Sequence, residues 1–424
     1  MRFQAPRGTQ DILPETSYLW RAIENILIEI AENYGYEEIR TPIFEETELF
    51  VRSTGTTSDI VSKEMYSFLD KSNRSLTLKP EGTAGVIRAL IEHGLAIPGQ
   101  LKRFWYIAPN FRYDRPQKGR YRQFHQFGLE LTGSTSTLAD LEIIEMTTLF
   151  YQALGLKNIT VHLNSLGNSS SRTEFAAALL KHASSFLKSQ PAEAQEKAQR
   201  NPLRLLDSKD PEIVQLMADA PSILSFIDED SNTHFKELQA LLTEASIPYQ
   251  VNPKIVRGLD YYTSTVFEVQ ADNLGAQNAL CGGGRYDNLV KELGGPDLPC
   301  VGVGIGIERA LLINPPLLQK TERPKLDIFV ISATESAQKA SITLVKKLRA
   351  LHFSVNFDLD QKSLKSQIKQ ADRLGARFAI LLGDDEIQKE CLTLRNLETG
   401  DQKSIKMNEL TSLKDHLAHH ASSK

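Results

Sequence analysis

Apolar residues recur at helical spacing near the start of the chain. They lie three or four positions apart between residues 15 and 34, which predicts an amphipathic helix, and Gly35 follows as a natural C-terminal stop. The repeated residues are Leu19, Ile23, Ile26, Leu27 and Ile30. The next segment, EEIRTPIFEE, predicts an extended stretch broken at Pro42, because the residue before a proline disfavours the helical conformation.

A different periodicity marks the predicted strands. Apolar and polar positions alternate on both sides of a basic loop within residues 100–132, which predicts two strands joined by a long loop. Residues 263–270 (TSTVFEVQ) are another strand candidate. Residues 301–313 (VGVGIGIERALLI) predict a strand that runs into a helix.

The texture of the sequence changes twice further along. Residues 170–246 are rich in Ala, Leu, Lys and Glu and contain few β-branched residues, which predicts a helical domain inserted into the strand-rich part. A linker-like stretch at 321–325 precedes alternating strand and helix patterns, which are typical of a small domain with a largely parallel sheet. We therefore expect three domains, at residues 1–169 with 247–322, 170–246 and 323–424.

The composition is that of a globular protein. The chain has 424 residues, 41% hydrophobic and 24% charged, and this length favours two or three domains. A formal net charge of −4 argues against a protein that coats nucleic acid indiscriminately, although binding through a local basic face stays open. Cys281, Cys300 and Cys391 lack a paired C-x-x-C spacing, so neither a zinc site nor a disulfide framework is expected. With no signal-peptide core and no bilayer-spanning run, we expect a cytoplasmic protein without membrane contact.

The predicted hairpin concentrates polar chemistry in residues 111–130. Arg112 ends the first strand, where a guanidinium suits a phosphate because it offers a fork of donors on a fixed backbone. Four more basic residues crowd the loop, namely Arg115, Lys118, Arg120 and Arg122. Phe124 could stack on a purine, while Gln126 and Glu130 share one strand face. A solvated basic hairpin is the alternative, yet polar residues on that face need a buried partner or water.

Glycine-rich segments occur twice. Gly302, Gly304 and Gly306 leave one strand face without side chains, so a flat ring could lie on the backbone. Arg309, in the first turn of the next helix, could reach over that ring to a polyphosphate. Tight packing of the strand against a helix explains these glycines equally well, and their spacing is not a Rossmann fingerprint. The glycines at 282–284 either let the backbone approach a ligand or form a turn.

Two more segments combine charge with hydrogen-bonding side chains. Residues 256–269 contain Arg257, Asp260, Tyr261 and Tyr262. Two tyrosines with a carboxylate suit a polar, flat side chain such as imidazole, although a turn with core tyrosines has the same pattern. In residues 75–94, Glu81 and Thr83 precede an amphipathic helix and could hold an ammonium group. A helix N-cap with an acidic first turn is the alternative.

Together these segments closely resemble the histidyl-tRNA synthetase family of class II aminoacyl-tRNA synthetases. The likeness starts at RGTQDILP (7–14) and runs through the C-terminal domain. Its most specific matches are RGLDYY (257–262), RPQKGRYRQFHQ (115–126) and PEGTAG (80–85). The resemblance implies an α+β catalytic domain with an antiparallel sheet flanked by helices, a helical insertion and a C-terminal α/β anticodon-binding domain. It also implies a homodimer built through the helix at 15–34 and the Pro42 strand.

The same resemblance implies a role for each matched residue. The histidine-binding residues would be Glu81, Gly82, Thr83, Arg112, Gln126, Glu130, Arg257, Tyr261 and Tyr262. The ATP-binding residues would be Arg112, Asp114, Phe124 and Arg309. The tRNA-binding residues would be Gln117, Lys118 and Arg120. Arg112 and Arg257 would be the catalytic pair at the α-phosphate.

The implied activity is that of a histidine–tRNA ligase. It would activate histidine with ATP, accompanied by Mg²⁺, to histidyl-adenylate and transfer it to the 3′-terminal adenosine of tRNA(His), releasing AMP and pyrophosphate. One alternative is a non-catalytic regulatory paralogue, which typically lacks the C-terminal domain and some of the ATP-binding arginines. Another is an enzyme that adenylates an amino acid for a different acceptor.

Two departures from the family pattern and one basic stripe complete the prediction. Asp114 stands where the family usually has Glu in Arg-x-Glu, so its carboxylate is one methylene shorter. Lys79 replaces the common Arg before PEGT, which keeps the charge but loses a bidentate donor. In the C-terminal domain, basic residues at helical spacing could lie along tRNA phosphates or could be a solvated helix face. They are Lys362, Lys365, Lys369 and Arg373.

Overall fold

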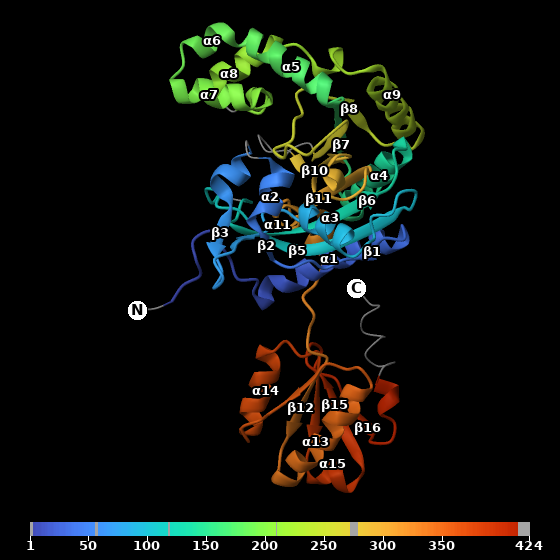
Figure 1. Cartoon of the computed structure of the whole chain (residues 1–424). Coiled ribbons are helices and arrows are strands. Elements are labelled where there is room, and N and C mark those ends of the chain that lie inside the picture. The colour runs from blue at the N-terminus through green and yellow to red at the C-terminus, as the bar shows by residue number, and fades with distance from the viewer. Residues whose placement is uncertain (1–2, 56–57, 118, 209, 272–278, 414–424) are drawn as a thin grey trace. The chain divides into compact units, whose positions relative to one another are not determined.

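The computed structural model describes residues 3–55, 58–117, 119–208, 210–271 and 279–413. The chain divides into two compact units, Met1–Thr321 and Glu322–Lys424 (Figure 1). Lys118, one of the expected tRNA-binding residues, lies outside the described residues. None of the helices in the described ranges is long and apolar enough to cross a lipid bilayer.

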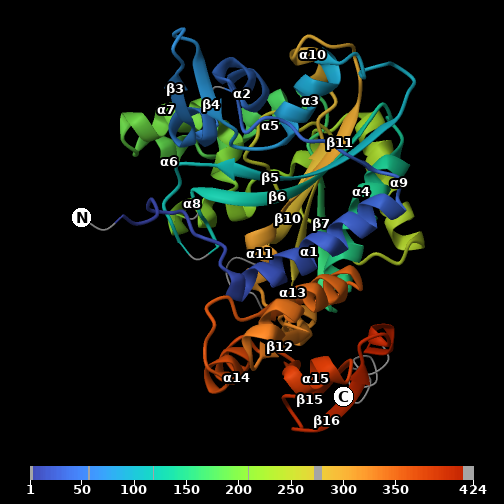
Figure 2. The ribbon, with the colours of Figure 1, turned by 90° about the horizontal axis from the view of Figure 1, so that it is seen from below.

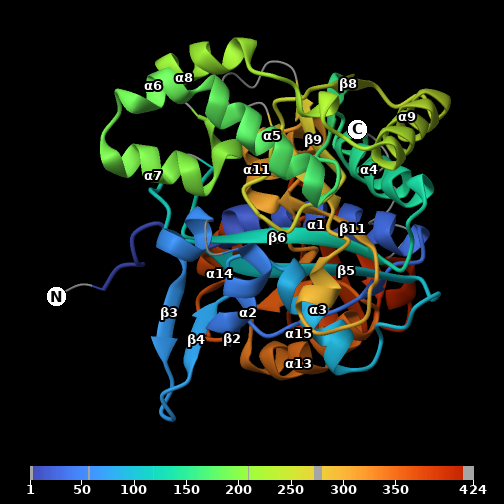
Figure 3. The same ribbon diagram turned by 45° about the horizontal axis from the view of Figure 1, so that its top comes forward.

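An eight-stranded sheet organises the first unit (Figures 1 and 3). Its strands in spatial order are β1 (Glu37–Glu38), β5 (Lys102–Phe111), β6 (Gln123–Thr132), β11 (Cys300–Gly306), β10 (Ala279–Arg285), β9 (Thr265–Ala271), β7 (Ile159–Ser165) and β8 (Tyr249–Val251). Neighbouring strands are antiparallel in the centre, whereas β1 with β5 and β7 with β8 are parallel pairs at the two edges. The expected antiparallel sheet is confirmed, and short parallel strands extend it on both sides.

Strand β10 corrects one interpretation of the sequence. The glycines at 282–284 allowed a turn, which is wrong because all three lie inside a central strand. A β-carbon on Gly283 would clash with the carbonyl oxygen of Gly302 and would lie 2.9 Å from the Phe267 ring. The close approach of neighbouring backbone and side chains therefore explains why this strand lacks side chains here.

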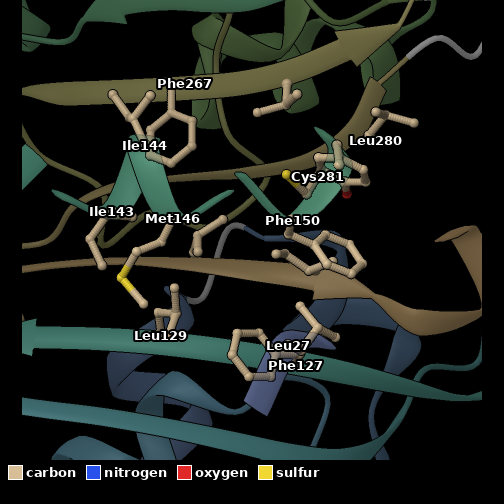
Figure 4. Close-up of a cluster of buried hydrophobic side chains, with 14 of the residues drawn as sticks. Leu27, Phe127, Leu129, Ile143, Ile144, Met146, Phe150, Phe267, Leu280 and Cys281 are labelled. Carbon is tan, nitrogen blue, oxygen red and sulfur yellow. The ribbon is translucent and has the colours of Figure 1, made fainter. Parts of the chain in front are cut away.

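Helices cover one face of the sheet and bury its main core. They are α1 (Pro14–Asn33), α4 (Thr137–Ala153), α9 (Glu229–Glu244) and α11 (Ile307–Leu312). The predicted N-terminal helix is confirmed as α1, which lies across this face in Figure 2. Figure 4 shows Leu27 of α1 and Ile144 of α4 in one cluster with Phe127 of β6 and Phe267 of β9. Each fully buried side chain of this kind contributes about 1.5–3 kcal/mol, so the core holds the sheet that carries the site.

Smaller elements pack on the opposite face of the sheet. They are α2 (Thr47–Thr54), a π-helical turn (Ile60–Glu64), α3 (Thr83–Glu92), α10 (Leu289–Glu292) and a three-stranded sheet of β2 (Phe44–Glu46), β4 (Ser75–Leu78) and β3 (Tyr66–Leu69). A second cluster of buried apolar residues lies here and includes Val86 of α3, Tyr106 of β5 and Val266 of β9. Strand alternation explains the two clusters, because successive side chains of a strand point to opposite faces. Trp105 and Phe267 are the chain neighbours of Tyr106 and Val266, and they belong to the first cluster.

The segment between β7 and β8 is helical, as its composition predicts. Besides α9 it contains α5 (Ser169–His182), α6 (Ser184–Lys188), α7 (Ala192–Arg200), α8 (Pro211–Leu216) and short 3-10 turns at Pro202–Leu205, Met217–Asp219 and Ile223–Ser225. Helices α5 to α8 form a group at one end of the sheet (Figure 3), whereas α9 packs on α4 in the main core. Asn168, Asp210 and Asp228 cap α5, α8 and α9 through backbone N–H groups.

The second unit is built on a five-stranded sheet. Its strands in spatial order are β13 (Val355–Phe357), β12 (Ile328–Ser332), β14 (Phe378–Leu382), β15 (Cys391–Asn396) and β16 (Gln402–Lys406). The first three are parallel, as expected, and β15 and β16 add an antiparallel edge that was not predicted. Its helices are α13 (Glu335–Ala350), α14 (Leu364–Arg373) and α15 (Asp384–Gln388). The first unit ends with α12 (Pro316–Lys320), directly before the predicted linker stretch at 321–325.

Candidate active site

A row of glycines crosses the centre of the large sheet. Gly128 on β6, Gly304 on β11 and Gly282 on β10 are register partners, so three adjacent strands carry no side chain in this row. Tyr106 on β5 and Glu268 on β9 are the next positions on either side. Because Tyr106 belongs to the second apolar cluster, the row lies on the face opposite the main helical core. Side chains and ligands can approach the backbone closely there.

Three guanidinium groups, far apart in the sequence, reach one cavity. Arg112 follows β5, Arg257 lies in the loop before β9, and Arg309 lies in the first turn of α11. All three line a cavity of about 1160 Å³. The other expected site residues along it are Asp114, Arg120, Phe124 and Tyr262. We call Arg112, Arg257 and Arg309 the guanidinium end of the site.

Arg112 is held from two sides. Its Nε donates to the carbonyl oxygen of Pro80 at 2.8 Å, and its guanidinium carbon lies 5.3 Å from the centre of the Phe124 ring. Burial lowers the pKa of Arg112, while the charges of Glu64 and Glu81 oppose that shift. An arginine keeps its charge near neutral pH even so, because its ordinary pKa is above 12.

Arg257 and Arg309 reach the cavity from different elements. The Nη1 atom of Arg257 donates to Oε1 of Glu268 at 2.6 Å, and the Tyr262 ring lies 5.8 Å from its guanidinium carbon. Burial lowers the pKa of Arg309. The turn that carries Arg309 is tied to β6, since Glu308 accepts the backbone N–H of His125 at 2.9 Å.

A buried hydrogen-bond network surrounds Glu130 on β6. One carboxylate oxygen accepts the Thr83 hydroxyl at 2.8 Å and the Tyr106 hydroxyl at 3.0 Å, and the other accepts the hydroxyl of Tyr286. Burial raises the pKa of Glu130 to about 8, although these three hydroxyl donors oppose the shift. The polar face that the sequence shows on this strand therefore has its buried partners. With Glu81, these residues form what we call the carboxylate network.

Glu81 belongs to the same network through the first turn of α3. Its carboxylate accepts the backbone N–H groups of Thr83 at 2.7 Å and Ala84 at 2.9 Å. Burial raises the pKa of Glu81, and the two backbone bonds and the charge of Arg112 oppose that shift. Glu81 thus bonds to the N–H groups at the start of α3, although Gly82 is the N-cap residue and the first turn contains no acidic residue. The binding of an ammonium group stays a prediction.

Tyrosine rings connect the carboxylate network with the cavity. Tyr262 lines the cavity, and its ring centre lies 4.8 Å from that of Tyr261. The Tyr261 ring in turn meets the edge of Tyr286 at 5.6 Å. Arg172 of α5 donates to the main-chain oxygen of Tyr262 at 2.8 Å, so the helical segment contacts this loop. Gln126, the remaining expected residue on β6, accepts the side-chain amide of Asn110 at 2.6 Å.

Of the expected residues that the structure describes in the loop between β5 and β6, some line the cavity and others do not. An isolated bridge pairs Gln117 with Arg120, and Arg120 also forms a 3.3 Å ion pair with Asp114. Arg120 and Asp114 line the cavity, whereas Gln117 is not among the described residues that line it. The second oxygen of Asp114 accepts the backbone N–H of Arg115 at 2.6 Å. The shorter carboxylate is therefore already engaged within its own loop.

The sequence did not single out four residues with polar contacts at the site. Tyr106 and Tyr286 donate to Glu130, Glu268 pairs with Arg257, and Glu308 holds β6. Each bonds to a residue on another element. Strand alternation gave one usable signal, because it put Gln126 and Glu130 on a face that required buried partners.

Comparisons with known proteins agree with this geometry. A histidyl-tRNA synthetase family model matches residues 8–310, and an anticodon binding domain model matches residues 327–413. The histidine–tRNA ligases of Gloeothece citriformis and Picosynechococcus sp. are both 47% identical to this chain, covering 96% of it and 95% of each relative. The crystal structure of apo S. aureus histidyl-tRNA synthetase is 37% identical, with a TM-score of 0.81 over 98% of this chain and 100% of that one. Since the likeness extends over both units, this chain belongs to the histidyl-tRNA synthetase family.

Proposed function

We propose that this protein joins histidine to tRNA(His) in two steps, with ATP and its Mg²⁺ as a substrate of the first. The observation that carries the proposal is the convergence of Arg112, Arg257 and Arg309 on one cavity. A triphosphate requires several fixed positive charges. Guanidinium groups meet this need because they stay charged and offer donors in a planar fork.

In the first step, a carboxylate oxygen of histidine attacks the α-phosphorus of ATP. The bond to pyrophosphate breaks and histidyl-adenylate forms. Arg112 and Arg257 would contact the α-phosphate oxygens, and Arg309 would hold the outer phosphates and cover the adenine, with Phe124 on its other face. Donors that are fixed in advance lower the barrier because they need no reorganisation during the reaction. This step needs no covalent enzyme nucleophile.

The carboxylate network would bind the amino acid itself. Glu81 and Thr83, with Gln126 nearby, would hold the α-amino group, and Glu130 with Tyr261 and Tyr262 would recognise the imidazole. Buried polar groups reject analogues that leave them unpaired, which can give discrimination of roughly 10⁴-fold without an editing reaction. The hydrogen bonds around Glu130 support this role, because they fix its carboxylate in one orientation.

In the second step, a ribose hydroxyl of the terminal adenosine of the tRNA attacks the carbonyl carbon of the adenylate, and AMP leaves. Gln117, Lys118 and Arg120 would meet the acceptor end, and Arg120 lines the cavity that would hold the adenylate. The anticodon binding domain match at 327–413 supports tRNA as the acceptor. We also expect a homodimer through α1 and the Pro42 segment, and a monomer in light scattering would contradict this assembly.

The first test replaces Arg257 by alanine. We expect histidine-dependent ATP–pyrophosphate exchange to fall by roughly 10²–10³-fold, as is typical when one oxyanion-stabilising donor is lost. ATP binding should change far less, because Arg112 and Arg309 remain. A matched control is Arg74→Ala, which removes an exposed arginine paired with Asp70. Near-normal exchange in Arg257→Ala would refute the proposed role.

The second test separates the enzyme from the alternatives. Aminoacylation is measured with each of the twenty amino acids and total tRNA, and only histidine should be attached. A regulatory paralogue would support neither exchange nor aminoacylation. An enzyme with another acceptor would form the adenylate but charge no tRNA. The anticodon binding domain match favours the tRNA ligase over both.

The third test concerns the basic stripe on α14. Lys365, Lys369 and Arg373 are exposed there, as a tRNA contact requires. Replacing Lys365 and Lys369 by glutamate should weaken tRNA binding and reduce its logarithmic salt dependence by roughly one unit per lost phosphate contact. Pyrophosphate exchange should not change. The control is Lys339→Glu on α13, and an unaltered salt dependence in the α14 variant would count against the contact.

A further inference from the structure

We propose that Glu268 and Gly282 are positioning residues that orient the guanidinium of Arg257 for adenylate formation. The inference rests on the role proposed above for Arg257. Neither residue is among the described residues that line the cavity. Both would therefore act on the substrate only through Arg257.

Strand alternation places both residues on the same side as Arg257. The preceding residues, Phe267 on β9 and Cys281 on β10, point into the main hydrophobic core, as Figure 4 shows. Because successive side chains of a strand point to opposite faces, Glu268 and the open position of Gly282 lie on the other face. The two are register partners on neighbouring strands, so they lie side by side. We call Glu268 and Gly282 together the seat of Arg257.

Glu268 holds one edge of the guanidinium. Its Oε1 accepts Nη1 of Arg257 at 2.6 Å, which is the short distance of a charge-assisted hydrogen bond. Its other oxygen contacts the side-chain amide of Gln270 at 3.4 Å. A guanidinium has five N–H donors, so one bond to Glu268 leaves others for substrate oxygens. The carboxylate therefore fixes the direction of the group without using all its donors.

Gly282 provides the space into which the guanidinium fits. A β-carbon there would lie 2.5 Å from Cζ and from Nη2 of Arg257, and it would clash with Nη1. Real β-carbons do not tolerate such distances, so a side chain at 282 must displace something. The displaced atoms are the far end of a flexible arginine. The fold can therefore accept the change, while Arg257 has to leave its position.

The seat has a kinetic consequence that can be separated from binding. A displacement of about 1 Å in a catalytic group can cost on the order of 10²-fold in rate. Arg112 and Arg309 would continue to hold the phosphates of ATP. Loss of the seat should therefore lower kcat for adenylate formation and leave KM for ATP nearly unchanged.

The experiment combines Glu268→Gln and Gly282→Ala with Arg257→Ala in the full-length protein. We expect each seat variant to lower kcat of histidine-dependent pyrophosphate exchange by roughly 10–10²-fold. In the Arg257→Ala background, each should add less than about twofold, because residues that act through one group are not additive. Glu268→Gln removes the charge, and Gly282→Ala keeps both charges and moves the guanidinium. The pair therefore probes the seat in two independent ways.

The matched control is Glu142→Gln. Glu142 accepts two hydrogen bonds from Arg103, at 2.8 and 3.1 Å, and neither residue is among the described residues that line the cavity. Its exchange should stay near that of the parent protein, and thermal unfolding checks that every variant folds. If Glu268→Gln does not fold, Gly282→Ala still decides the matter. The seat is refuted if the seat variants exchange normally while Arg257→Ala is crippled, or if their effects multiply with it. Normal exchange in Arg257→Ala is a different result, since it removes the proposed role of Arg257 itself.

Discussion

The guanidinium end consists of basic groups and the carboxylate network of acidic ones, and the two parts of the site are built in different ways. Each arginine reaches the cavity from a separate element. Arg112 donates to the main-chain oxygen of Pro80, and Arg257 donates to the carboxylate of Glu268. Glu130, in contrast, lies at the centre of three hydroxyl donors. A guanidinium has five N–H donors, so Arg112 and Arg257 retain donors for a substrate, whereas much of the hydrogen-bonding capacity of Glu130 is used within the protein.

The difference shows how burial acts on each kind of charge. Burial lowers the pKa of Arg112, but an arginine starts so high that it remains a cation. Burial raises the pKa of Glu130 to about 8, which moves its titration into the neutral range. The guanidinium end should therefore be insensitive to pH between 6 and 9, while the carboxylate network should respond to it.

The largest effect is expected at the guanidinium end. Arg112→Ala should reduce pyrophosphate exchange by roughly 10³-fold, since it removes a fixed charge from the α-phosphate. Arg112→Lys should recover little of this loss, because lysine keeps the charge but lacks the planar fork that meets both Pro80 and a phosphate. Steady-state exchange kinetics measure both variants. If lysine restored full activity, positive charge alone would explain the role of position 112. The geometry of the guanidinium would then not matter, and this difference between the guanidinium end and the carboxylate network would be refuted.

A smaller effect, dependent on pH, is expected in the carboxylate network. The pKa of Glu130 in the fold is about 8, against an ordinary value of 4.5, so the fold favours its protonated form. That contribution to stability is complete below pH 4.5 and is lost as pH rises through 8. Each pKa unit corresponds to about 1.4 kcal/mol. The parent protein should therefore lose stability relative to Glu130→Gln between pH 5 and 9.

Unfolding midpoints of the two proteins, measured without ligand at several pH values, test this expectation. The midpoint of the parent should fall relative to that of Glu130→Gln as pH increases. Parallel curves would show that Glu130 titrates at its ordinary value and that the hydroxyl donors balance the effect of burial. Arg74→Ala serves as a second reference, because Arg74 is an exposed arginine and its removal should change stability equally at every pH in this range.

The sequence predicted the residues of the guanidinium end better than those of the carboxylate network. Arg112 and Arg309 follow predicted strands, so strand ends alone marked them as fixed and accessible. Tyr106 and Tyr286 lie 24 and 156 positions from their partner Glu130, and no local pattern links such positions. Their assignment needs the register of β5 with β6 and the path of the chain after β10, which only the folded sheet provides.

The same reason explains the errors and gaps in the predicted fold. The glycines at 282–284 resemble a turn locally, and only the crowding around Gly283 shows that they belong to a central strand. The family resemblance supplied the roles proposed for Glu81 and Glu130. The residues alone left Glu81 open between binding an ammonium group and capping a helix, and they left the hairpin that carries Glu130 open between a binding site and a solvated basic hairpin. Alternation supplied the one independent hint, the polar face at 126 and 130.

The smallest effect is expected for Tyr106→Phe. The ring fits between Gly82 and Gly128, where a β-carbon on either glycine would overlap it, so phenylalanine should keep its place. The 3.0 Å hydrogen bond to Glu130 is lost. One such bond contributes about 0.5–1.5 kcal/mol, so KM for histidine should rise by roughly two- to tenfold with little change in kcat.

Tyr36→Phe is a matched control for that variant, because Tyr36 donates to Glu142 at 2.9 Å outside the cavity lining. It should leave KM for histidine unchanged. Loss of a donor to Glu130 should also raise the pKa of that carboxyl further, so the KM effect of Tyr106→Phe should vary with pH. A fall in kcat at constant KM would instead show that Tyr106 acts on the phosphate chemistry. The carboxylate network and the guanidinium end would then not have separate functions.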